Sequence, residues 1–282
     1  MIRHFRRIFA LLLALMLCMP AAQAQHSALN ILLIGVDTIR EEENGRSDTM
    51  LLVRADPVSG DIRMVSFLRD LFVRIPGVGS TRLNAAYFHG GAALLKQTLE
   101  ENFGVQIDRT VTVHFSLLCD LVDELGGVEI EVAQREFSHL NRLIADYNDS
   151  YGLEGGLLEA PGLQRLNGKQ ALCYSRMRKI DSDFQRTGRQ QAVLAGMLRQ
   201  AASLGRWDLI RLAVSSLARV QTDLTLGDVL SLLPLASQLE STSIRTAQVP
   251  FEGAYTDETV SGMMVLKPDL ERCRKQLQRF WE

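Results

Sequence analysis

Continuous apolar segments alternate with amphipathic ones along most of the chain. Residues 29–37 read LNILLIGVD, an apolar run that predicts a central strand covered on both faces, with Asp37 at its carboxyl end. Two more strands are predicted, one in RSDTMLLVRAD at 46–56 and one at 62–67, joined by a turn at 57–60. The first part of the chain therefore predicts neighbouring strands of one sheet.

Strands and helices continue to alternate after residue 67. Further strands are predicted at 71–75, 105–115, 128–132 and 243–249. Helices are predicted at 92–103, 116–125, 167–173, 190–204, 208–219, 226–239 with Thr225 as its cap, and from Pro268 to 281. Residues 138–166 have weak periodicity, and the middle of this segment is predicted to form a long loop. This alternation predicts an α/β fold with a largely parallel or mixed sheet and helices on its faces.

The first 24 residues differ from the rest. An arginine-rich start precedes an apolar run at residues 8–19, which is too short to span a bilayer comfortably. A small-x-small pattern ending at Ala24 follows, so residues 1–24 are predicted to be a secretory signal peptide, with an uncleaved anchor as the alternative. Residues 25–282 are predicted to be one domain, because no linker or repeat divides them.

Composition and charge narrow the function classes. The 282 residues are 46% hydrophobic and 23% charged, as in ordinary globular proteins. Taking the three arginines of residues 1–24 from the 31 basic residues leaves 28 against 33 acidic ones, a net charge of minus 5. An acidic body argues against nucleic-acid binding. Cys119, Cys173 and Cys273 have no disulfide-framework or zinc spacing, and are predicted to be buried or incidental thiols with at most one bridged pair.

The segment from Tyr174 to Gln191, YSRMRKIDSDFQRTGRQQ, concentrates cationic side chains. On an extended segment, Arg176 and Arg178 would point the same way as Tyr174. Asp183 is predicted to cap a helix on which three polar side chains share one face: Arg186, Arg189 and Gln190. A helix N-terminus beside arginines favours a phosphate ligand, and the alternative is a charged amphipathic surface.

Other charged groups lie at strand ends or in loops: Asp37, Arg46, Asp48, Arg69 and Asp70. Ligands of open α/β sheets bind beyond the carboxyl ends of strands, so these groups are expected to converge with the cationic segment. The carboxylates of Asp37, Asp48 and Asp183 suit Mg²⁺, and the arginines suit a diphosphate. GxSxG, HExxH, Walker and GxGxxG motifs are absent, and three isolated histidines are expected to be structural or at the surface: His89, His114 and His139.

The order of motifs resembles one known family. ILLIGVD, RSDTMLLV, VSFLRDLFVRIPG, RLNAAYFHGG, FSLLCDLVDELGGVEIEV and LNGKQALCYSRMRKIDSDFQRTGRQQ are similar to segments of the LytR-CpsA-Psr family of wall-polymer ligases. The resemblance covers about residues 29–204, and residues 205–282 are expected to be helix-rich packing. It implies a three-layer α/β/α sandwich around a central mixed sheet, with an apolar tunnel that holds a lipid tail.

The resemblance also implies an activity and a site. Such an enzyme is extracytoplasmic, lies at the membrane surface, and transfers a glycopolymer from a polyprenyl diphosphate carrier to peptidoglycan through a phosphodiester. The Mg²⁺-associated carboxylates of the family correspond to Asp37 and Asp48. Its diphosphate-binding positions correspond to Arg46, Arg69, Arg82, Arg176, Arg178, Asp183, Arg186 and Gln190. The residues expected to be catalytic are Asp37, Asp48, Arg69 and Arg178. One of the two aspartates could accept the proton of the attacking hydroxyl, but metal binding is the favoured role for both.

Three features depart from the family pattern. Leu68 replaces the usual proline before Arg69, His89 replaces the usual aromatic before the glycine pair, and the leader looks cleavable where many members keep an anchor. Two other functions stay open, namely a regulator that binds polyprenyl diphosphates without turning them over, and a diphosphatase. Acidic groups contribute little to binding an anion, so Asp37 and Asp48 together favour chemistry.

Overall fold

A mixed six-stranded sheet forms the centre of the molecule. The computed structural model describes residues 28–36, 45–177, 183–217, 219–236 and 244–282. The strand order is β10-β3-β2-β1-β6-β9, in which β1 is antiparallel to β2 and parallel to β6, and β3 is parallel to β10. The strands are β1 (Leu29–Val36), β2 (Ser47–Ala55), β3 (Ile62–Phe67), β6 (Arg109–His114), β9 (Gln221–Thr222) and β10 (Ile244–Val249). The predicted mixed sheet is confirmed.

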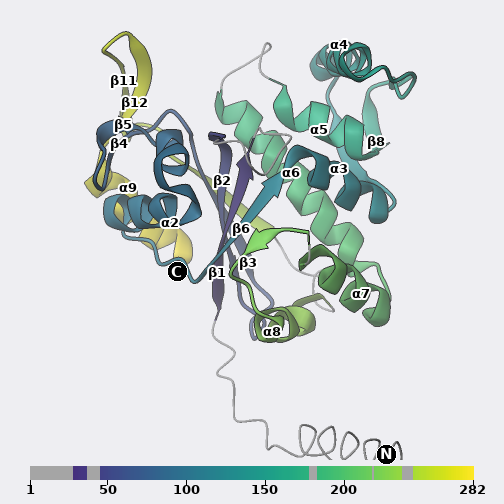
Figure 1. Ribbon diagram of the computed structural model, residues 1–282, viewed down its shortest axis with the longest axis horizontal. Coiled ribbons are helices and arrows are strands. Elements are labelled where there is room, and N and C mark those ends of the chain that lie inside the picture. The colour runs from purple at the N-terminus through teal and green to yellow at the C-terminus, as the bar shows by residue number, and fades with distance from the viewer. Residues whose placement is uncertain (1–27, 37–44, 178–182, 218, 237–243) are drawn as a thin grey trace, which may run out of the picture.

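Helices cover both faces of this sheet. Figure 1 shows α2 and α9 on one side and α3, α5, α6 and α7 on the other, with α8 at the end where β1 begins. The helices are α2 (Asn84–Phe103), α3 (Phe115–Glu124), α4 (Gln134–Tyr151), α5 (Gly168–Arg176), α6 (Asp183–Ala202), α7 (Arg206–Leu217), α8 (Leu226–Ala236) and α9 (Leu270–Trp281). The predicted three-layer α/β/α architecture is confirmed.

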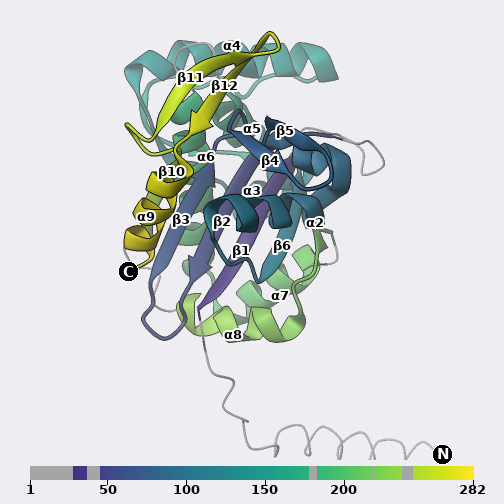
Figure 2. The same cartoon turned by 90° about the vertical axis from the view of Figure 1, so that its left-hand side faces the viewer.

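Three two-stranded ribbons lie outside the main sheet. They are β4 (Phe72–Ile75) with β5 (Gly79–Arg82), β7 (Val128–Val132) with β8 (Gly162–Leu166), and β11 (Tyr255–Val260) with β12 (Met263–Pro268). Figure 2 shows β11 and β12 on the same side of the molecule as α4, beyond the opposite end of the sheet from α8.

Strand β1 illustrates how the sequence pattern builds the layers. Leu32, Ile34 and Val36 are at most 1% exposed and pack in the core formed with α2 and α9. Leu33 alternates with them and therefore points to the opposite face, toward α6. Both faces of the strand are apolar, which agrees with the doubly covered strand predicted from ILLIGV.

The loop predicted for the middle of residues 138–166 is present but confined to residues 152–161, and regular elements that were not predicted flank it. Residues 134–151 form α4, which buries Leu140 and Ile144 one helical turn apart, and residues 162–166 form β8. The carboxylate of Glu136 accepts a hydrogen bond from the Ala133 backbone N–H at 3.1 Å and stabilises the helix start. The polar side chains between the buried positions hid this helical stripe.

Several predicted boundaries also change. Residues 174–176 are the last turn of α5 and not an extended segment, because α5 begins at the Asn167 cap and continues to Arg176. Helix α2 begins at Asn84, eight residues before the predicted start at residue 92. Its backbone is non-helical at Gly90 and Gly91.

In the C-terminal part, residues 205–282 contain the β11–β12 hairpin in addition to the expected helices. Pro268 ends β12, and Asp269 caps the terminal helix by accepting from the Arg272 backbone N–H. The helix predicted at 116–125 begins one residue earlier, at Phe115. Thr225 caps α8 as predicted, because its hydroxyl accepts from the Asp228 backbone N–H at 3.1 Å.

The three cysteines of the described chain are separate thiols. Cys119, Cys173 and Cys273 are free, and burial raises the pKa of Cys119 to about 12 and of Cys173 to about 11. The expectation of buried thiols is confirmed for Cys173 and Cys273, whereas Cys119 is partly exposed. Across the described residues, every helix falls short of the length and hydropathy that a bilayer crossing requires.

Candidate functional site

The guanidinium group of Arg69 is the centre of a charged cluster at one end of the sheet. Its Nη1 donates to the Asp48 carboxylate at 2.9 Å, and its Nε lies 3.3 Å from Asp183 and 3.5 Å from Asp70. Burial disfavours the charged form of Arg69, but the hydrogen bond to Asp48 and the charges of Asp183 and Asp48 outweigh this, so its pKa is raised. Arg69 therefore stays cationic.

Arg186 joins this cluster from the first turns of α6. It is 2% exposed, and its Nη2 lies 3.3 Å from the Asp183 carboxylate and 3.5 Å from the Asp48 backbone oxygen. Asp183 is the first residue of α6 and stands between the guanidinium groups of Arg69 and Arg186. The prediction that residues from β2, the loop after β3 and the cationic segment converge is confirmed for Asp48, Arg69, Asp183 and Arg186.

Arg82 extends the cluster toward the β11–β12 hairpin. Its Nε lies 3.3 Å from the Asp70 carboxylate, whose other contact is Arg69, and its Nη2 donates to the Met264 backbone oxygen at 2.5 Å. Arg82 therefore links the charged cluster to the hairpin.

An apolar cavity of about 370 Å³ begins at the charged cluster and runs between the sheet and α6. Its polar lining includes Asp48, Arg176, Arg186 and Gln190, and nearly all its other walls are apolar. We call it the upper cavity. The apolar walls come from β1, β2, β6, α3, α6, α7 and α8, with Leu33, Leu51, Val113, Leu118, Val193 and Leu217 among them. A charged mouth on an oily pocket suits an amphiphile whose head group is anionic.

A second cavity, about 390 Å³, continues toward the other end of the sheet, and we call it the lower cavity. The two share Leu33, Leu194, Ala213 and Val229 in their linings. Along β2 the lining passes from Asp48 at the mouth to Ala55 at the far end, and along α6 from Arg186 to Ala202. The shared lining and the course of β2 and α6 thus describe one apolar path, which is the tunnel expected from the family resemblance.

Gly35 allows the upper cavity to form next to the mouth. A Cβ added to Gly35 would lie 2.9 Å from the Thr49 Cβ on the paired strand, closer than side chains normally approach. The glycine therefore lets β1 and β2 pair closely at the point where both line the cavity.

Phe115 holds Arg176 at the mouth and was not predicted from the sequence. The Arg176 guanidinium carbon lies 4.6 Å from the centre of the Phe115 ring, a cation–π contact, and both residues line the upper cavity. The signal available in the sequence was an aromatic directly after a strand, at its carboxyl end. Arg176 itself is exposed at the C-terminus of α5.

A buried ion pair supports the cationic segment from behind. Arg189 donates to the Glu136 carboxylate at 2.8 Å and to the Met177 backbone oxygen at 2.9 Å, and the two side chains are 3% and 8% exposed. Arg189 was predicted to share a ligand-facing side with Arg186, but it packs instead against α4. Glu136 was missed because its partner is 53 residues away in sequence.

Four other residues were predicted to belong to the site: Asp37, Arg46, Arg178 and Gln190. Asp37 and Arg178 lie outside the described residues. Arg46 is exposed immediately before β2, next to that undescribed stretch. Gln190 lines the upper cavity one turn after Arg186, as the helical spacing predicts.

The side chains in the described part of the chain supply only some of the ligands that a magnesium site needs. No group of three metal-ligating side chains occurs among the described residues. Asp48 supplies a hard carboxylate at the mouth, and Mg²⁺ commonly takes one or two protein carboxylates together with phosphate oxygens and water. Asp48 therefore fits the role of one ligand, while Asp37, the second predicted ligand, lies outside the described residues.

Comparison with known sequences finds relatives that are named as teichoic acid transferases. It is 31% identical over 258 residues to the polyisoprenyl-teichoic acid–peptidoglycan teichoic acid transferase TagU of Enterococcus faecalis, covering 88% of this chain and 78% of TagU. It is 30% identical over 261 residues to TagV of Bacillus subtilis, which carries the same activity in its name, covering 88% of this chain and 63% of TagV. The chain thus spans less than two thirds of TagV.

Solved structures give the same result for the fold. The structure superimposes on TagT of Bacillus subtilis with bound octaprenyl pyrophosphate lipid, with a TM-score of 0.68 and 26% sequence identity over 90% of both chains. The model of the LytR_cpsA_psr family matches residues 18–279, nearly the whole length. The motif order, the α/β/α sandwich with its apolar tunnel, and these matches lead to one conclusion: the chain belongs to the LytR-CpsA-Psr family.

Proposed function

We propose that this protein transfers a glycopolymer from a polyprenyl diphosphate carrier to peptidoglycan and links the two through a phosphodiester. The observation that carries the proposal is the position of the Arg69 and Arg186 cluster at the mouth of an apolar path. A polyprenyl diphosphate has the complementary form, with a dianionic head on a long apolar tail. The names of TagU and TagV, and the lipid bound to TagT, support the same substrate class.

The proposed reaction is a phosphoryl transfer. A hydroxyl oxygen of the acceptor glycan attacks the phosphorus that carries the polymer, and a new P–O bond forms. The bond from that phosphorus to the bridging oxygen breaks, and polyprenyl phosphate leaves with the bonding electrons. The hydroxyl proton passes to a carboxylate, for which Asp48 at the mouth is the described candidate and Asp37 the other.

The arginines supply most of the catalysis in this scheme. Phosphoryl transfer depends chiefly on positioning and on stabilising negative charge in the transition state. Arg69 and Arg186 come from different elements but are fixed by Asp183, so their positive groups are already in place before a ligand binds. Mg²⁺ held by Asp48 and Asp37 would neutralise further charge on the diphosphate oxygens. We propose an extracytoplasmic location at the membrane surface, because the leader resembles a secretory signal or an anchor.

One assay separates this function from the two alternatives. Purified protein would be incubated with a labelled polyprenyl diphosphate oligosaccharide, peptidoglycan oligomers and Mg²⁺. Label joined to the glycan through a phosphodiester supports the proposal. Release of the sugar phosphate without joining indicates a diphosphatase, and retention of the intact lipid indicates a binding regulator. The Arg69→Ala variant is expected to lose at least about a hundredfold in transfer while it remains folded, and full activity in this variant would exclude the proposed site.

A further inference from the structure

The end of the molecule where β1 begins carries exposed apolar side chains that the site does not use. Trp207 is 77% exposed, and Leu226 and Leu230 are 55% and 49% exposed. Trp207 lies in the first turn of α7 and Leu226 is the first residue of α8, and Figures 1 and 2 show both helices toward the end of the sheet where β1 begins. We call Trp207, Leu226 and Leu230 the α7/α8 patch. A tryptophan so exposed is uncommon on a soluble surface, but is favoured at a membrane interface.

Helices α7 and α8 are apolar on more than one side. Among the described side chains of α7 none is buried, and in α8 only Leu235 is buried. Their inner sides border the lower cavity through Leu209, Ala213, Leu232 and Leu233. The two helices therefore separate the apolar path from the surroundings at this end. Their outer sides bear the patch.

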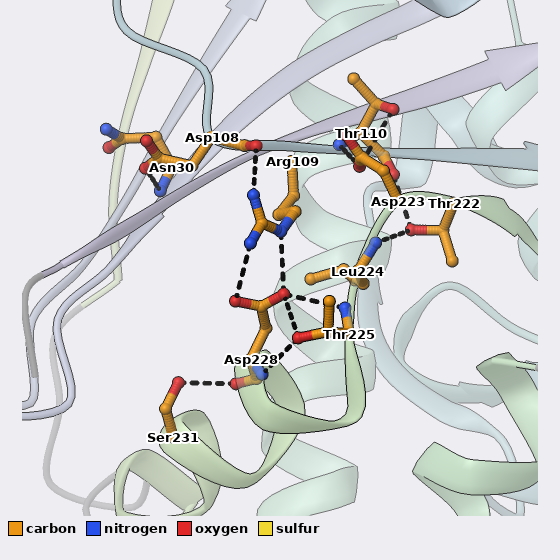
Figure 3. A network of polar contacts seen from close by, with 10 residues as sticks. All are labelled: Asn30, Asp108, Arg109, Thr110, Thr222, Asp223, Leu224, Thr225, Asp228 and Ser231. Atoms are coloured by element: carbon orange, nitrogen blue, oxygen red, sulfur yellow. Dashed lines mark hydrogen bonds and ion pairs between the residues drawn. The ribbon is translucent and has the colours of Figure 1, made fainter. Parts of the chain in front are cut away.

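A polar network fixes α8 beside the start of β1. Figure 3 shows the Asn30 backbone N–H donating to Asp108 at 2.8 Å, and Arg109 donating to both carboxylate oxygens of Asp228 at 2.8 and 3.3 Å. Asp228 lies in the first turn of α8, two residues from Leu226. The α8 part of the patch is therefore held close to the start of β1.

This arrangement places the patch next to the point where residues 1–27 join the described chain. Those residues include the cationic start and the apolar run at 8–19, the most membrane-like stretch of the sequence. The charged mouth lies at the other end of the path, since the lining along β2 runs from Asp48 at the mouth to Ala55. One end of the molecule thus combines the leader junction, the lower cavity and the patch.

We infer that the α7/α8 patch is the surface that contacts the phospholipid bilayer, with Trp207, Leu226 and Leu230 inserted at its interface. A bilayer is the occupant favoured here because the leader junction and the lower cavity meet at this end. The inference rests on the proposed function in one respect, namely that the carrier's tail occupies the lower cavity. The diphosphate would then be held at the far mouth, facing away from the bilayer toward the wall acceptor.

The two tryptophans of the chain allow a direct test. Trp281 packs with Phe280 against the core formed with α2 and α9, and so is an internal control for Trp207. The full chain would be reconstituted with phosphatidylcholine and phosphatidylglycerol vesicles that carry brominated acyl chains. In the Trp281→Phe variant, the remaining Trp207 is expected to shift its emission to the blue and lose most of it to bromine quenching. In the Trp207→Phe variant, Trp281 is expected to keep its emission.

Unquenched Trp207 in vesicle-bound protein would overturn the inference. Quenching of Trp281 to the same extent would also overturn it, because the bound orientation would then be different. Neither outcome depends on whether the protein transfers a polymer, so this test stands apart from the proposed function.

A second experiment tests the consequence for transfer. The variant Trp207→Ser, Leu226→Ser, Leu230→Ser removes the patch, and Leu163→Ser is the matched control, since Leu163 is 66% exposed on β8, away from α8. With the carrier lipid in vesicles, transfer by the patch variant is expected to fall by at least about tenfold, since the loss of even one inserted apolar side chain lowers partitioning by about that factor. With the carrier in detergent, transfer is expected to be unchanged, and the control should match wild type in both.

Equal loss in vesicles and detergent would show a structural role for these side chains and contradict the inference. Unchanged transfer from vesicles would contradict it as well. If the wild-type protein transfers nothing from either source, the proposed function fails, while the bromine quenching still decides whether the patch contacts the bilayer.

Discussion

The two faces of the central sheet are both apolar, yet they are packed very differently. On the face covered by α2 and α9, Leu32 and Ile34 of β1 are fully buried. On the face covered by α6, α7 and α8, Leu33 is only partly buried, and it lines both the upper and the lower cavity. The same strand thus contributes to a close-packed core on one side and to a hollow one on the other.

This difference shows which side of the sheet evolved for a ligand. Protein interiors are normally as dense as organic crystals, and an unfilled apolar cavity forfeits contacts that would stabilise the fold. On the α2/α9 face the side chains of β1 are fully buried, whereas the α6 face gives up packing along a path that ends at the Arg69 cluster. The four predictions below address this contrast.

The largest expected effect is a difference in the free energy of unfolding between alanine variants on the two faces. Ile34→Ala removes a fully buried side chain from the packed face and is expected to lower the free energy of unfolding by about 3 kcal/mol. Leu33→Ala, one residue away on the hollow face, is expected to cost about 1 kcal/mol, because its side chain already borders a void. Urea denaturation of the two variants measures the difference, and equal losses would contradict the contrast.

The buried pair behind the cationic segment is expected to come next. Glu136→Gln leaves the Arg189 charge without its carboxylate and should lower stability by roughly 2 kcal/mol, less than full removal of a buried partner. Arg189 also donates to the Met177 backbone oxygen, so a loosened pair should disturb the approach to Arg178 and raise KM for the carrier lipid more than it lowers kcat.

Arg189→Lys is the conservative comparison, because it keeps the positive charge but loses the two-pronged hydrogen bonding of the guanidinium group. Its KM should lie between those of the wild type and the Glu136→Gln variant. A stability loss with KM unchanged would limit the pair to a structural role.

Filling the hollow face should affect the ligand and spare the fold. Ala213 lines both cavities, and Ala213→Phe places an aromatic ring in the path between them. We expect binding of a long polyprenyl diphosphate to weaken about tenfold, or roughly 1.4 kcal/mol, while stability stays within about 0.5 kcal/mol of wild type. A diphosphate with a very short prenyl chain is the control, because it should bind both proteins alike.

The smallest expected effect lies at the mouth. Phe115→Leu keeps an apolar wall but removes the ring under Arg176, and a partly exposed cation–π contact contributes about 0.5–1 kcal/mol. Carrier binding should therefore weaken by roughly two- to fivefold, and Phe115→Tyr should restore it. Titration with the labelled carrier lipid measures both variants. An unchanged affinity in Phe115→Leu would show that Arg176 needs no support from the ring.

Much of the sheet could be predicted from local patterns, and the errors have physical causes. The strands at 29–37, 46–56 and 62–67 were recognisable, because a strand covered on both faces is apolar at nearly every position. Helix α4 was missed because its buried stripe is narrow and its other faces are polar. The hairpin of β11 and β12 was missed because its strands are short and largely exposed, so that no clean alternation marks them.

The site was partly predictable, for a different reason. Asp48, Arg69, Asp183 and Arg186 were found because charged residues gather at strand ends and at a helix start, where open α/β sheets bind ligands and helix N-termini bind anions. Glu136 could not be found this way, since its role depends on a partner that tertiary folding brings from far along the chain. The hollow face was equally invisible from hydrophobicity, because residues that line a cavity and residues that fill a core are of the same types.

The central claim is that the charged mouth and the apolar path bind one amphiphile together. Calorimetric titration of the protein with octaprenyl diphosphate, octaprenol and inorganic diphosphate tests it most directly. We predict tight binding of octaprenyl diphosphate, much weaker binding of octaprenol and of diphosphate alone, and loss of the head-group contribution in Arg69→Ala. Binding of octaprenyl diphosphate no tighter than that of inorganic diphosphate would contradict the account.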